Sequence, residues 1–276
     1  GIRDDEWIAE KFPEVDIILG AHTHHIFHEG KEMNGTLLGA GGKHGNFVGH
    51  IMVELDVQSR KVISRRAQLY EQDHLHASKD EDQEIKGWHE KGKVLLNDTV
   101  AVLKNDLAAD WFQPSELPQL LTDGLLQWCE ADCAFLNAGL VLEGLPKGEV
   151  SRFDIHRILP HPINPCVVKL TGAQLKEVLK ATRDEELHHL QVKGLGFRGK
   201  IMGEFVYTSV GFGRDIGHIY INGKLIDPHK TYKLATTDMF TFGHFFPELQ
   251  RAEKHYFMPE FLRDVLTWKL KETNTL

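Results

Sequence analysis

Apolar and polar positions in the first part of the chain follow the period of a helix and then that of a strand. Apolar residues recur at helical spacing at Trp7, Ile8 and Phe12. Asp4 and Asp5 stand where they can cap this helix, and Pro13 is expected to end it. The run Val15 to Leu19 is rich in apolar residues and is followed by Gly20, which predicts a strand covered on both faces.

Alternating and glycine-rich segments come next. The segment GTLLGAGGKHGNFVGHIMVELDV, residues 35–57, predicts two strands joined by a Gly-rich turn. A further short strand is expected in KVISRRAQLY, residues 61–70. Residues 74–99 are rich in charge and poor in apolar periodicity, which is typical of a solvated helix that links two domains.

The rest of the chain alternates amphipathic helices with short strands. Helices are predicted over LPQLLTDGLLQWCEA, SRFDIHRIL, TGAQLKEVLKAT and PEFLRDVLTWKLKE, and strands in CAFLN, GEFVYTSV, HIYINGK and YKLATT. Ser151 and Thr171 precede two of these helices and are candidate N-caps, because their hydroxyl oxygens can accept backbone N–H groups of the first turn.

Length and charge restrict the class of protein. A chain of 276 residues exceeds one ordinary core and predicts two domains. No apolar run approaches the roughly 20 residues that span a bilayer, so we expect no membrane partner. The net charge of -8 argues against a nucleic-acid partner, because binding to the phosphate backbone requires clustered Lys and Arg.

The three cysteines are expected to be unpaired core thiols. Cys129 and Cys133 lie four residues apart in a stretch predicted as helix, and together with Cys166 they fit neither a disulfide framework nor a structural zinc site. Free thiols favour a reducing compartment, and we therefore expect a cytoplasmic protein.

Three histidines follow the first predicted strand, in the sequence GAHTHH. His22 and His24 are one residue apart, so in an extended backbone both side chains project to the same side and can reach one metal or two neighbouring ones. Ligands gather at the carboxyl ends of strands in α/β folds, which favours a metal site here. On spacing alone, polar residues at a strand end without a function explain the motif equally well.

Gly20-x-His22-x-His24 resembles the last metal-ligand motif of the calcineurin-like metallophosphoesterases. Further along, FLNAGLVLEGLPKGEVSRFDIHRILPHPINPCVVKLTGAQLKEVL resembles, in order and spacing, signatures of the 5'-nucleotidase C-terminal domain. The resemblance implies an α/β and α+β chain. Residues 1–73 would be the incomplete C-terminal portion of a metallophosphoesterase α/β/β/α sandwich, residues 74–99 a linker helix, and residues 100–276 the α+β substrate-binding domain.

The resemblance also implies two divalent metal ions, Mn, Zn, Mg or Fe, with His22 bound to one and His24 to the other. His25 has no counterpart in the family motif. The family's remaining ligand motifs precede Gly-x-His-x-His, and only nineteen residues precede Gly20 here. Asp154-Ile155-His156 and Asp227-Pro228-His229 match Asp-x-His only formally, since they fall in a predicted helix and a predicted turn. We therefore expect the N-terminal part of the catalytic domain to be missing and the chain alone to be inactive.

The family's base-binding signatures are present in altered form. The residues at the matching positions, which we expect to contact substrate, are Asn137, Gly139, His161, Asn164, His244, Phe245 and Phe246. The arginine of the first signature is absent, with Leu142 near its place. His161 replaces a stacking Phe, and His244 replaces an Asp.

Two functions remain open on the sequence. The first is part of a metal-dependent phosphohydrolase, in which a two-metal-activated hydroxide cleaves a nucleotide or another small phosphate ester. The second is a nucleotide-binding sensor or interaction module on a nucleotidase frame that does not hydrolyse its ligand. Intact upstream metal motifs would separate the two.

Overall fold

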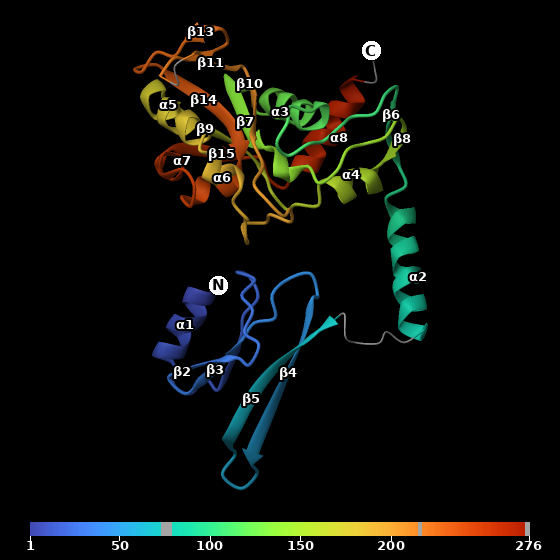
Figure 1. Ribbon diagram of the computed structural model, residues 1–276, viewed down its shortest axis with the longest axis vertical. Coiled ribbons are helices and arrows are strands. Elements are labelled where there is room, and N and C mark those ends of the chain that lie inside the picture. Colours follow the sequence, from blue (N-terminus) through green and yellow to red (C-terminus); the bar gives the residue numbers. More distant parts are fainter. Residues whose placement is uncertain (73–78, 215–216, 274–276) are drawn as a thin grey trace. The chain divides into compact units, whose positions relative to one another are not determined.

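The computed structural model describes residues 1–72, 79–214 and 217–273 and divides into two compact units, Gly1–Trp88 and His89–Leu276 (Figure 1). The division falls inside α2 (Lys79–Leu95), a helix without a buried residue. This helix is shorter than the predicted linker because Thr99 already begins a strand. Residues 74–78 of that linker, and the predicted boundary after residue 73, lie outside the described residues.

The described residues of the first unit form helix α1 (Ile2–Lys11), two small sheets and the first part of α2. Helix α1 has Gly1 as its N-cap, so Asp4 and Asp5 lie in its first turn instead of preceding it as caps. The strands are β1 (Ile17–Leu19), β2 (Lys31–Met33), β3 (Thr36–Gly39), β4 (Phe47–Asp56) and β5 (Lys61–Glu71). Strand β3 pairs with β1 in parallel and with β2 antiparallel, and β4 and β5 form a two-stranded hairpin. The strands expected in residues 35–57 and 61–70 are thus present.

The core of the first unit is small. Its buried apolar residues, among those described, are Ala9, Leu37, Leu38 and Ala40. Leu19, at the end of β1, is 74% exposed, so the prediction of a strand covered on both faces is wrong. The faces of a strand are covered by packed layers, and the few buried apolar side chains described in this unit provide no such layer over Leu19. Strand β1 also lies at the edge of its three-stranded sheet. Several apolar side chains of the hairpin are exposed as well, among them Val48, Met52, Val53, Leu55 and Ile63.

The second unit is organised around a five-stranded sheet in the order β10-β7-β14-β9-β15. These strands are β7 (Cys133–Asn137), β9 (Pro165–Thr171), β10 (Phe205–Thr208), β14 (Thr231–Thr237) and β15 (Glu253–Tyr256). Strands β7 and β14 are parallel and the other pairs antiparallel. Smaller sheets pair β6 (Thr99–Leu103) with β8 (Gly148–Ser151), and β11 (Val210–Phe212) with β12 (Ile219–Ile221) and β13 (Lys224–Leu225).

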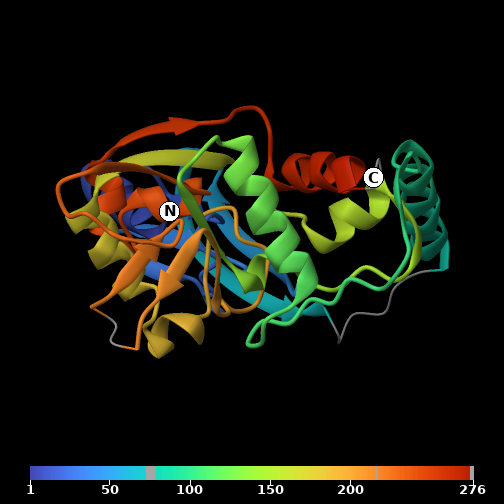
Figure 2. The ribbon, with the colours of Figure 1, turned by 90° about the horizontal axis from the view of Figure 1, so that it is seen from above.

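Helices cover both faces of this sheet. Helices α3 (Glu116–Trp128) and α8 (Leu262–Thr273) lie side by side, joined by an edge contact between Trp128 and Trp268, whose ring centroids are 5.5 Å apart (Figure 2). Helix α4 (Arg152–Ile158) packs on α8. Helix α5 (Gly172–Ala181) packs on β9 and β14, and α6 (Glu185–His188) and α7 (Pro247–Arg251) are shorter. The structure describes no helix that is long and apolar enough to cross a membrane.

Capping explains where two of these helices begin. The hydroxyl oxygen of Ser151 accepts the backbone N–H of Asp154, and that of Thr171 accepts the N–H of Gln174. In both cases the side chain of the third helical residue returns a bond to the cap, which completes a capping box. Both predicted N-caps are confirmed.

All three cysteines are buried and free, as expected. Cys129 ends α3, but Cys133 begins β7, so the predicted helix does not extend to it. The turn at Glu130, whose φ is 48°, separates the two elements. Burial raises the pKa of the Cys129 thiol, and it raises the pKa of Cys133 and of Cys166 to about 12.

Candidate functional site

One edge of the five-stranded sheet gathers most of the residues predicted to contact substrate. Strand β7 ends at Asn137 and its parallel neighbour β14 ends at Thr237. Strands β9 and β10 run the opposite way and begin at this edge, where Pro165 faces Thr237 and Phe205 faces Asn137. The loops after β7 and β14 and before β9 and β10 therefore meet, as loops at the carboxyl ends of parallel strands commonly do at ligand sites.

The loop after β7 is held by backbone contacts. The Asn137 side chain is fully buried, and its Nδ2 donates to the carbonyl of Met202 over 2.7 Å. The backbone N–H of Gly139 donates to the same carbonyl over 2.9 Å. A Cβ at residue 139 would lie 1.9 Å from the carbonyl oxygen of Ile201, so only glycine fits there. In this structure both predicted residues hold the loop against the segment before β10.

The His161 ring is fully buried and stacks on Phe197 with centroids 5.3 Å apart and planes 9° apart. The backbone N–H of Arg198 donates to Nδ1 over 2.8 Å, so Nδ1 is an acceptor. The proton therefore sits on Nε2, which donates to the carbonyl of Leu140 over 2.6 Å. Burial lowers the pKa of His161 to about 4, against the weaker opposite effect of the Leu140 bond. The ring is thus neutral at physiological pH.

Asn164 and Asp238 join the loop before β9 to the loop after β14. The backbone N–H of Asp238 donates to the Asn164 carbonyl over 3.1 Å, and the nearby backbone N–H groups of Asn164 and Met239 favour the ionised Asp238 carboxylate, whose Oδ1 has no hydrogen-bond partner among the described residues. Asn164 Nδ2 donates to the carbonyl of Glu260 over 2.7 Å. Burial raises the pKa of Asp238 to about 6 despite those two N–H groups. Sequence reasoning missed Asp238, although its place directly after the predicted strand YKLATT was a usable signal.

The three predicted substrate residues that follow β14, His244, Phe245 and Phe246, differ in exposure. Phe246 is fully buried and packs in an aromatic cluster with Phe135, Phe205 and Phe240. Phe245 is half-buried against Phe240, and His244 is exposed. Of the seven predicted residues, therefore, His244 is exposed, Asn164 and Phe245 are half-buried, and four are buried.

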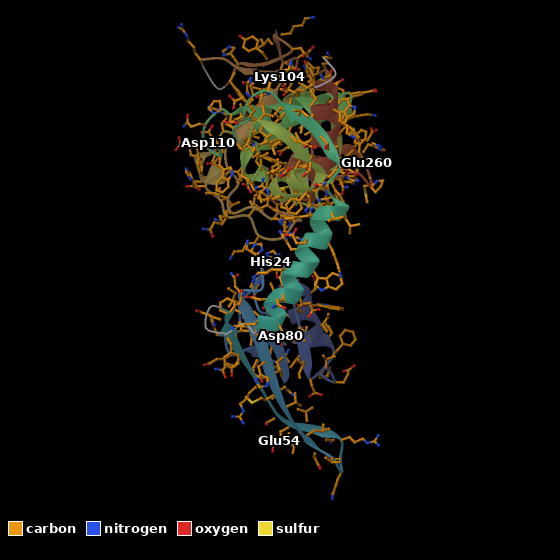
Figure 3. The ribbon with its side chains drawn as sticks, turned by 90° about the vertical axis from the view of Figure 1, so that its right-hand side faces the viewer. His24, Glu54, Asp80, Lys104, Asp110 and Glu260 are labelled. Atoms are coloured by element: carbon orange, nitrogen blue, oxygen red, sulfur yellow. The ribbon has the colours of Figure 1, made fainter. Side chains whose placement is uncertain are left out.

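In the first unit, His22 and His24 lie in a turn and not in an extended segment. The backbone N–H of His24 donates to the carbonyl of Ala21 over 2.9 Å, and His24 has a φ of 55°, so the predicted extended geometry is wrong. The turn is tied to the start of α1, since Thr23 Oγ1 accepts the backbone N–H of Ile2 over 3.2 Å. Figure 3 shows His24 at the opposite end of this unit from Glu54, which lies near the tip of the β4–β5 hairpin.

These residues do not by themselves make a metal centre. Across residues 1–72, 79–214 and 217–273, no three His, Cys, Asp or Glu side chains come together in a way that could hold an ion. Asp154 and His156 lie within α4, and Asp227 to His229 form a turn, as expected for formal matches only. Two imidazoles supply too few ligands for a pair of divalent ions.

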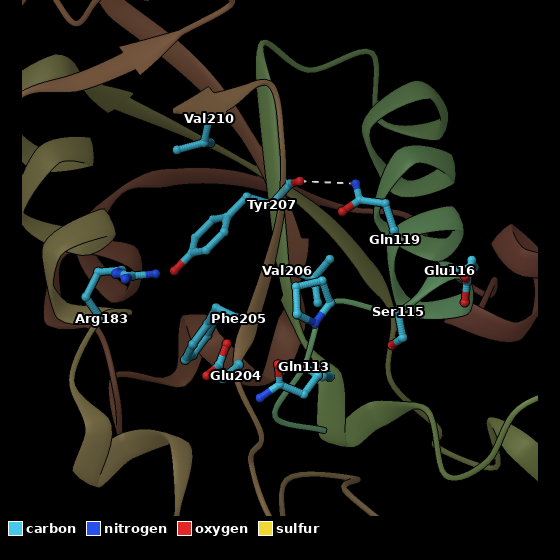
Figure 4. Close-up of a pocket in the computed structure, with 12 residues that line it drawn as sticks. Gln113, Ser115, Glu116, Gln119, Arg183, Glu204, Phe205, Val206, Tyr207 and Val210 are labelled. Carbon is cyan, nitrogen blue, oxygen red and sulfur yellow. Dashed lines mark hydrogen bonds between the residues drawn. The ribbon is translucent and has the colours of Figure 1, made fainter. Parts of the chain in front are cut away.

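A cavity of about 580 Å³ lies at the free edge of β10 in the second unit (Figure 4). It is bordered by the first turn of α3, by Ala138 next to Asn137, by Arg183, by Glu204 directly before β10, and by Phe205 to Tyr207 of β10. None of the seven predicted residues lines it. Sequence reasoning placed the strand GEFVYTSV but had no signal for the cavity, because α3 and Arg183 reach it from distant parts of the chain.

Comparison with known proteins identifies relatives of this architecture. The family model described as "5'-nucleotidase, C-terminal domain" matches residues 96–246, more than half of the chain. YunD, an uncharacterized metallophosphoesterase of Bacillus subtilis (strain 168), is 42% identical over 282 residues, which cover 99% of this chain and 61% of YunD. This chain therefore spans less than two thirds of the relative's length.

Solved structures share the fold. A candidate 5'-nucleotidase from Staphylococcus aureus in complex with alpha-ketoglutarate has a TM-score of 0.68 at 18% identity, over 98% of this chain and 56% of that one. A 5'-nucleotidase precursor from Thermus thermophilus has a TM-score of 0.58 at 16% identity, over 99% and 59%. At such identities the likeness describes the fold alone, which is mixed α/β and ends in an α+β domain.

Proposed function

We propose, from the premise that this chain belongs to the 5'-nucleotidase family, that it is part of a metal-dependent phosphohydrolase acting on nucleotide phosphate esters. The observation that carries the proposal is the match of residues 96–246 to the C-terminal domain of that family. The description of the 42% identical relative as a metallophosphoesterase supports hydrolysis of a phosphate ester.

We assign His22 and His24 to a pair of divalent ions, Mn, Zn, Mg or Fe, as two of its ligands. When bound, such a pair polarises a phosphoryl group and lowers the pKa of a water molecule. The described residues do not complete the ligand set. We therefore expect the 276-residue chain alone to hydrolyse no phosphate ester.

The proposed substrate is a nucleoside monophosphate or another small phosphate ester. We assign its recognition to the edge of the sheet at the carboxyl ends of β7 and β14, which we call the substrate edge. It carries Asn137, Gly139, His161, Asn164, His244, Phe245 and Phe246. The exposed imidazole of His244 and the half-buried ring of Phe245 are available for contact. The four buried residues would act by fixing the loops that carry the others.

The test compares this chain with YunD, which extends beyond the aligned region. Each protein is incubated with Mn²⁺, its metal content is measured by mass spectrometry, and AMP hydrolysis is followed. We expect metal-dependent hydrolysis by YunD only, and a loss of at least about a hundredfold when the YunD residue aligned with His22 or with His24 is replaced by alanine. Replacement of the YunD residue aligned with His25 by alanine is the control, and it should leave hydrolysis unchanged, because His25 has no counterpart in the family's ligand motif.

Two results would change the proposal. Rapid metal-dependent hydrolysis by the 276-residue chain would overturn its predicted inactivity. If both this chain and YunD bind the nucleotide and neither hydrolyses it, the result would favour the second function, a sensor or interaction module. The absence of a complete ligand set among the described residues is the observation that keeps this alternative open.

A further inference from the structure

The β10-edge cavity, defined by the residues shown in Figure 4, has the size of a small-molecule site. Its volume of about 580 Å³ lies inside the range of roughly 300 to 1,000 Å³ that such sites occupy. It is formed within the second unit by α3, β10, β11 and the residue Arg183. What it could bind follows from the groups on its walls.

The floor of the cavity is the unpaired edge of a strand. Because Ala138 N–H donates to the Glu204 carbonyl over 2.8 Å, the antiparallel register makes Phe205 and Tyr207 the residues whose backbone groups point away from β7. Strand β10 is the edge strand of its sheet, so these groups face the cavity. The carbonyl of Phe205 and the N–H of Tyr207 together form an acceptor and a donor side by side.

This edge is too short to receive another strand. At one end, the Glu204 N–H already donates to the carbonyl of Trp111 over 2.8 Å. At the other, Gln119 Nε2 donates to the carbonyl of Tyr207 over 3.1 Å, the bond dashed in Figure 4. The backbone groups left between these two points suit a planar molecule with one donor beside one acceptor, as on the hydrogen-bonding edge of a nucleobase.

A positive charge lies beside the floor of the cavity. The Arg183 guanidinium lies over the Phe212 ring, 5.2 Å from its centroid, and points toward the Tyr207 hydroxyl (Figure 4). Tyr207 is itself held by a 2.7 Å hydrogen bond to Thr182 Oγ1 and by an edge contact with Phe212. A guanidinium carries five N–H donors, so those not directed at the Tyr207 hydroxyl can bind a phosphate in a fork geometry.

The remaining walls supply carboxylate and apolar surface. Glu204 and Glu116 border the cavity, together with the apolar Pro114, Val206 and Val210. A simple anion would be repelled by the two carboxylates. A ligand that also carries hydroxyl groups can instead donate hydrogen bonds to them, as a ribose does to an acidic residue in dinucleotide sites.

We propose that the β10-edge cavity is a second nucleotide site, separate from the predicted substrate residues, that binds a nucleoside monophosphate as effector or product. The base lies against the backbone edge of Phe205 and Tyr207, the ribose hydroxyls face Glu204, and the phosphate binds Arg183. The choice of a nucleotide rests on the proposed function, whereas the positions of the three groups rest on the cavity itself.

The test is titration calorimetry of the 276-residue chain with AMP, adenosine and ribose 5-phosphate. We expect Arg183→Ala to weaken AMP by at least about tenfold and to leave adenosine unchanged, because only AMP carries the phosphate. A merely structural effect would weaken both ligands equally. Arg251→Ala, which removes an exposed arginine of α7, is the matched control, and circular dichroism verifies that each variant is folded.

A second pair of variants separates this inference from the proposed function. Glu204→Gln should weaken AMP and adenosine together at the β10-edge cavity, whereas His244→Ala should reduce AMP binding only at the proposed substrate residues. If AMP binding is lost in His244→Ala but kept in Arg183→Ala, the second site is wrong and the proposed substrate edge stands. If the wild-type chain binds none of the three ligands, the second site is wrong, and AMP hydrolysis by YunD then decides the proposed function separately.

Discussion

At the scale of single residues, His161 and Asp238 oppose each other in their effect on stability. The native pKa of His161 is about 4 instead of 6.5, so its contribution is present above pH 6.5 and is lost as the pH falls toward 4. The native pKa of Asp238 is about 6 instead of 3.8, so its contribution is present below pH 3.8 and is lost as the pH rises through 6. Between about pH 4 and pH 6, the stability lost through His161 as the pH falls is largely offset by the stability gained through Asp238.

Replacing Asp238 by asparagine should expose the effect of His161. At pH 7 we expect Asp238→Asn to raise the free energy of unfolding by about 1 kcal/mol, because the substitution removes a partly buried charge whose Oδ1 has no hydrogen-bond partner among the described residues. Below pH 4 the gain should vanish, so the variant loses stability more steeply on acidification than the wild type. Urea denaturation followed by tryptophan fluorescence at several pH values measures this. A variant less stable than the wild type at pH 7 would contradict the assignment.

At the scale of elements, amphipathic period and caps were enough to find the helices α3, α4, α5 and α8. They were not enough for β9, which lies between β14 and β15. Its sequence begins with proline and runs directly into the cap of α5, so it offers no separate turn signal. The motif residues at the sheet edge could likewise be identified from sequence, but not their burial. For His161 that depends on Leu140 and Arg198, which are distant in the chain.

The short helix η2 (Ala138–Leu140) gives a prediction at the same scale. Gly139→Ala should lower the free energy of unfolding by at least about 2 kcal/mol, because the new Cβ would overlap backbone carbonyls and the backbone would have to move. Gly92→Ala is the matched control, since a Cβ in α2 meets nothing within 4 Å and alanine favours the helix by about 0.8 kcal/mol. Denaturation midpoints of both variants measure the contrast. Equal midpoints would mean that η2 is not packed as described.

At the scale of the whole molecule, the two units differ in how much apolar surface they bury. Among its described residues, the first unit buries the apolar side chains of Ala9, Leu37, Leu38 and Ala40. The core of the second unit includes residues from β7, β9, β10 and β14 of the large sheet. Strand β15 contributes Tyr256, which packs against that core. We expect amide hydrogens of β3 to exchange at least about tenfold faster than those of β9 and β14, because local stability follows buried apolar contact. Hydrogen exchange with mass spectrometry of the intact chain measures both. Equal protection would show that the first unit is more stable than its core predicts.

The three buried cysteines can report how the second unit unfolds. All of them lie in the second unit, and burial keeps each thiol protonated, so a thiol reagent attacks only when that unit opens. Cys129, Cys133 and Cys166 sit on α3, β7 and β9, which join different parts of one core. The order in which a thiol reagent labels the three cysteines therefore reports the order in which these elements become exposed during unfolding. No added probe is needed.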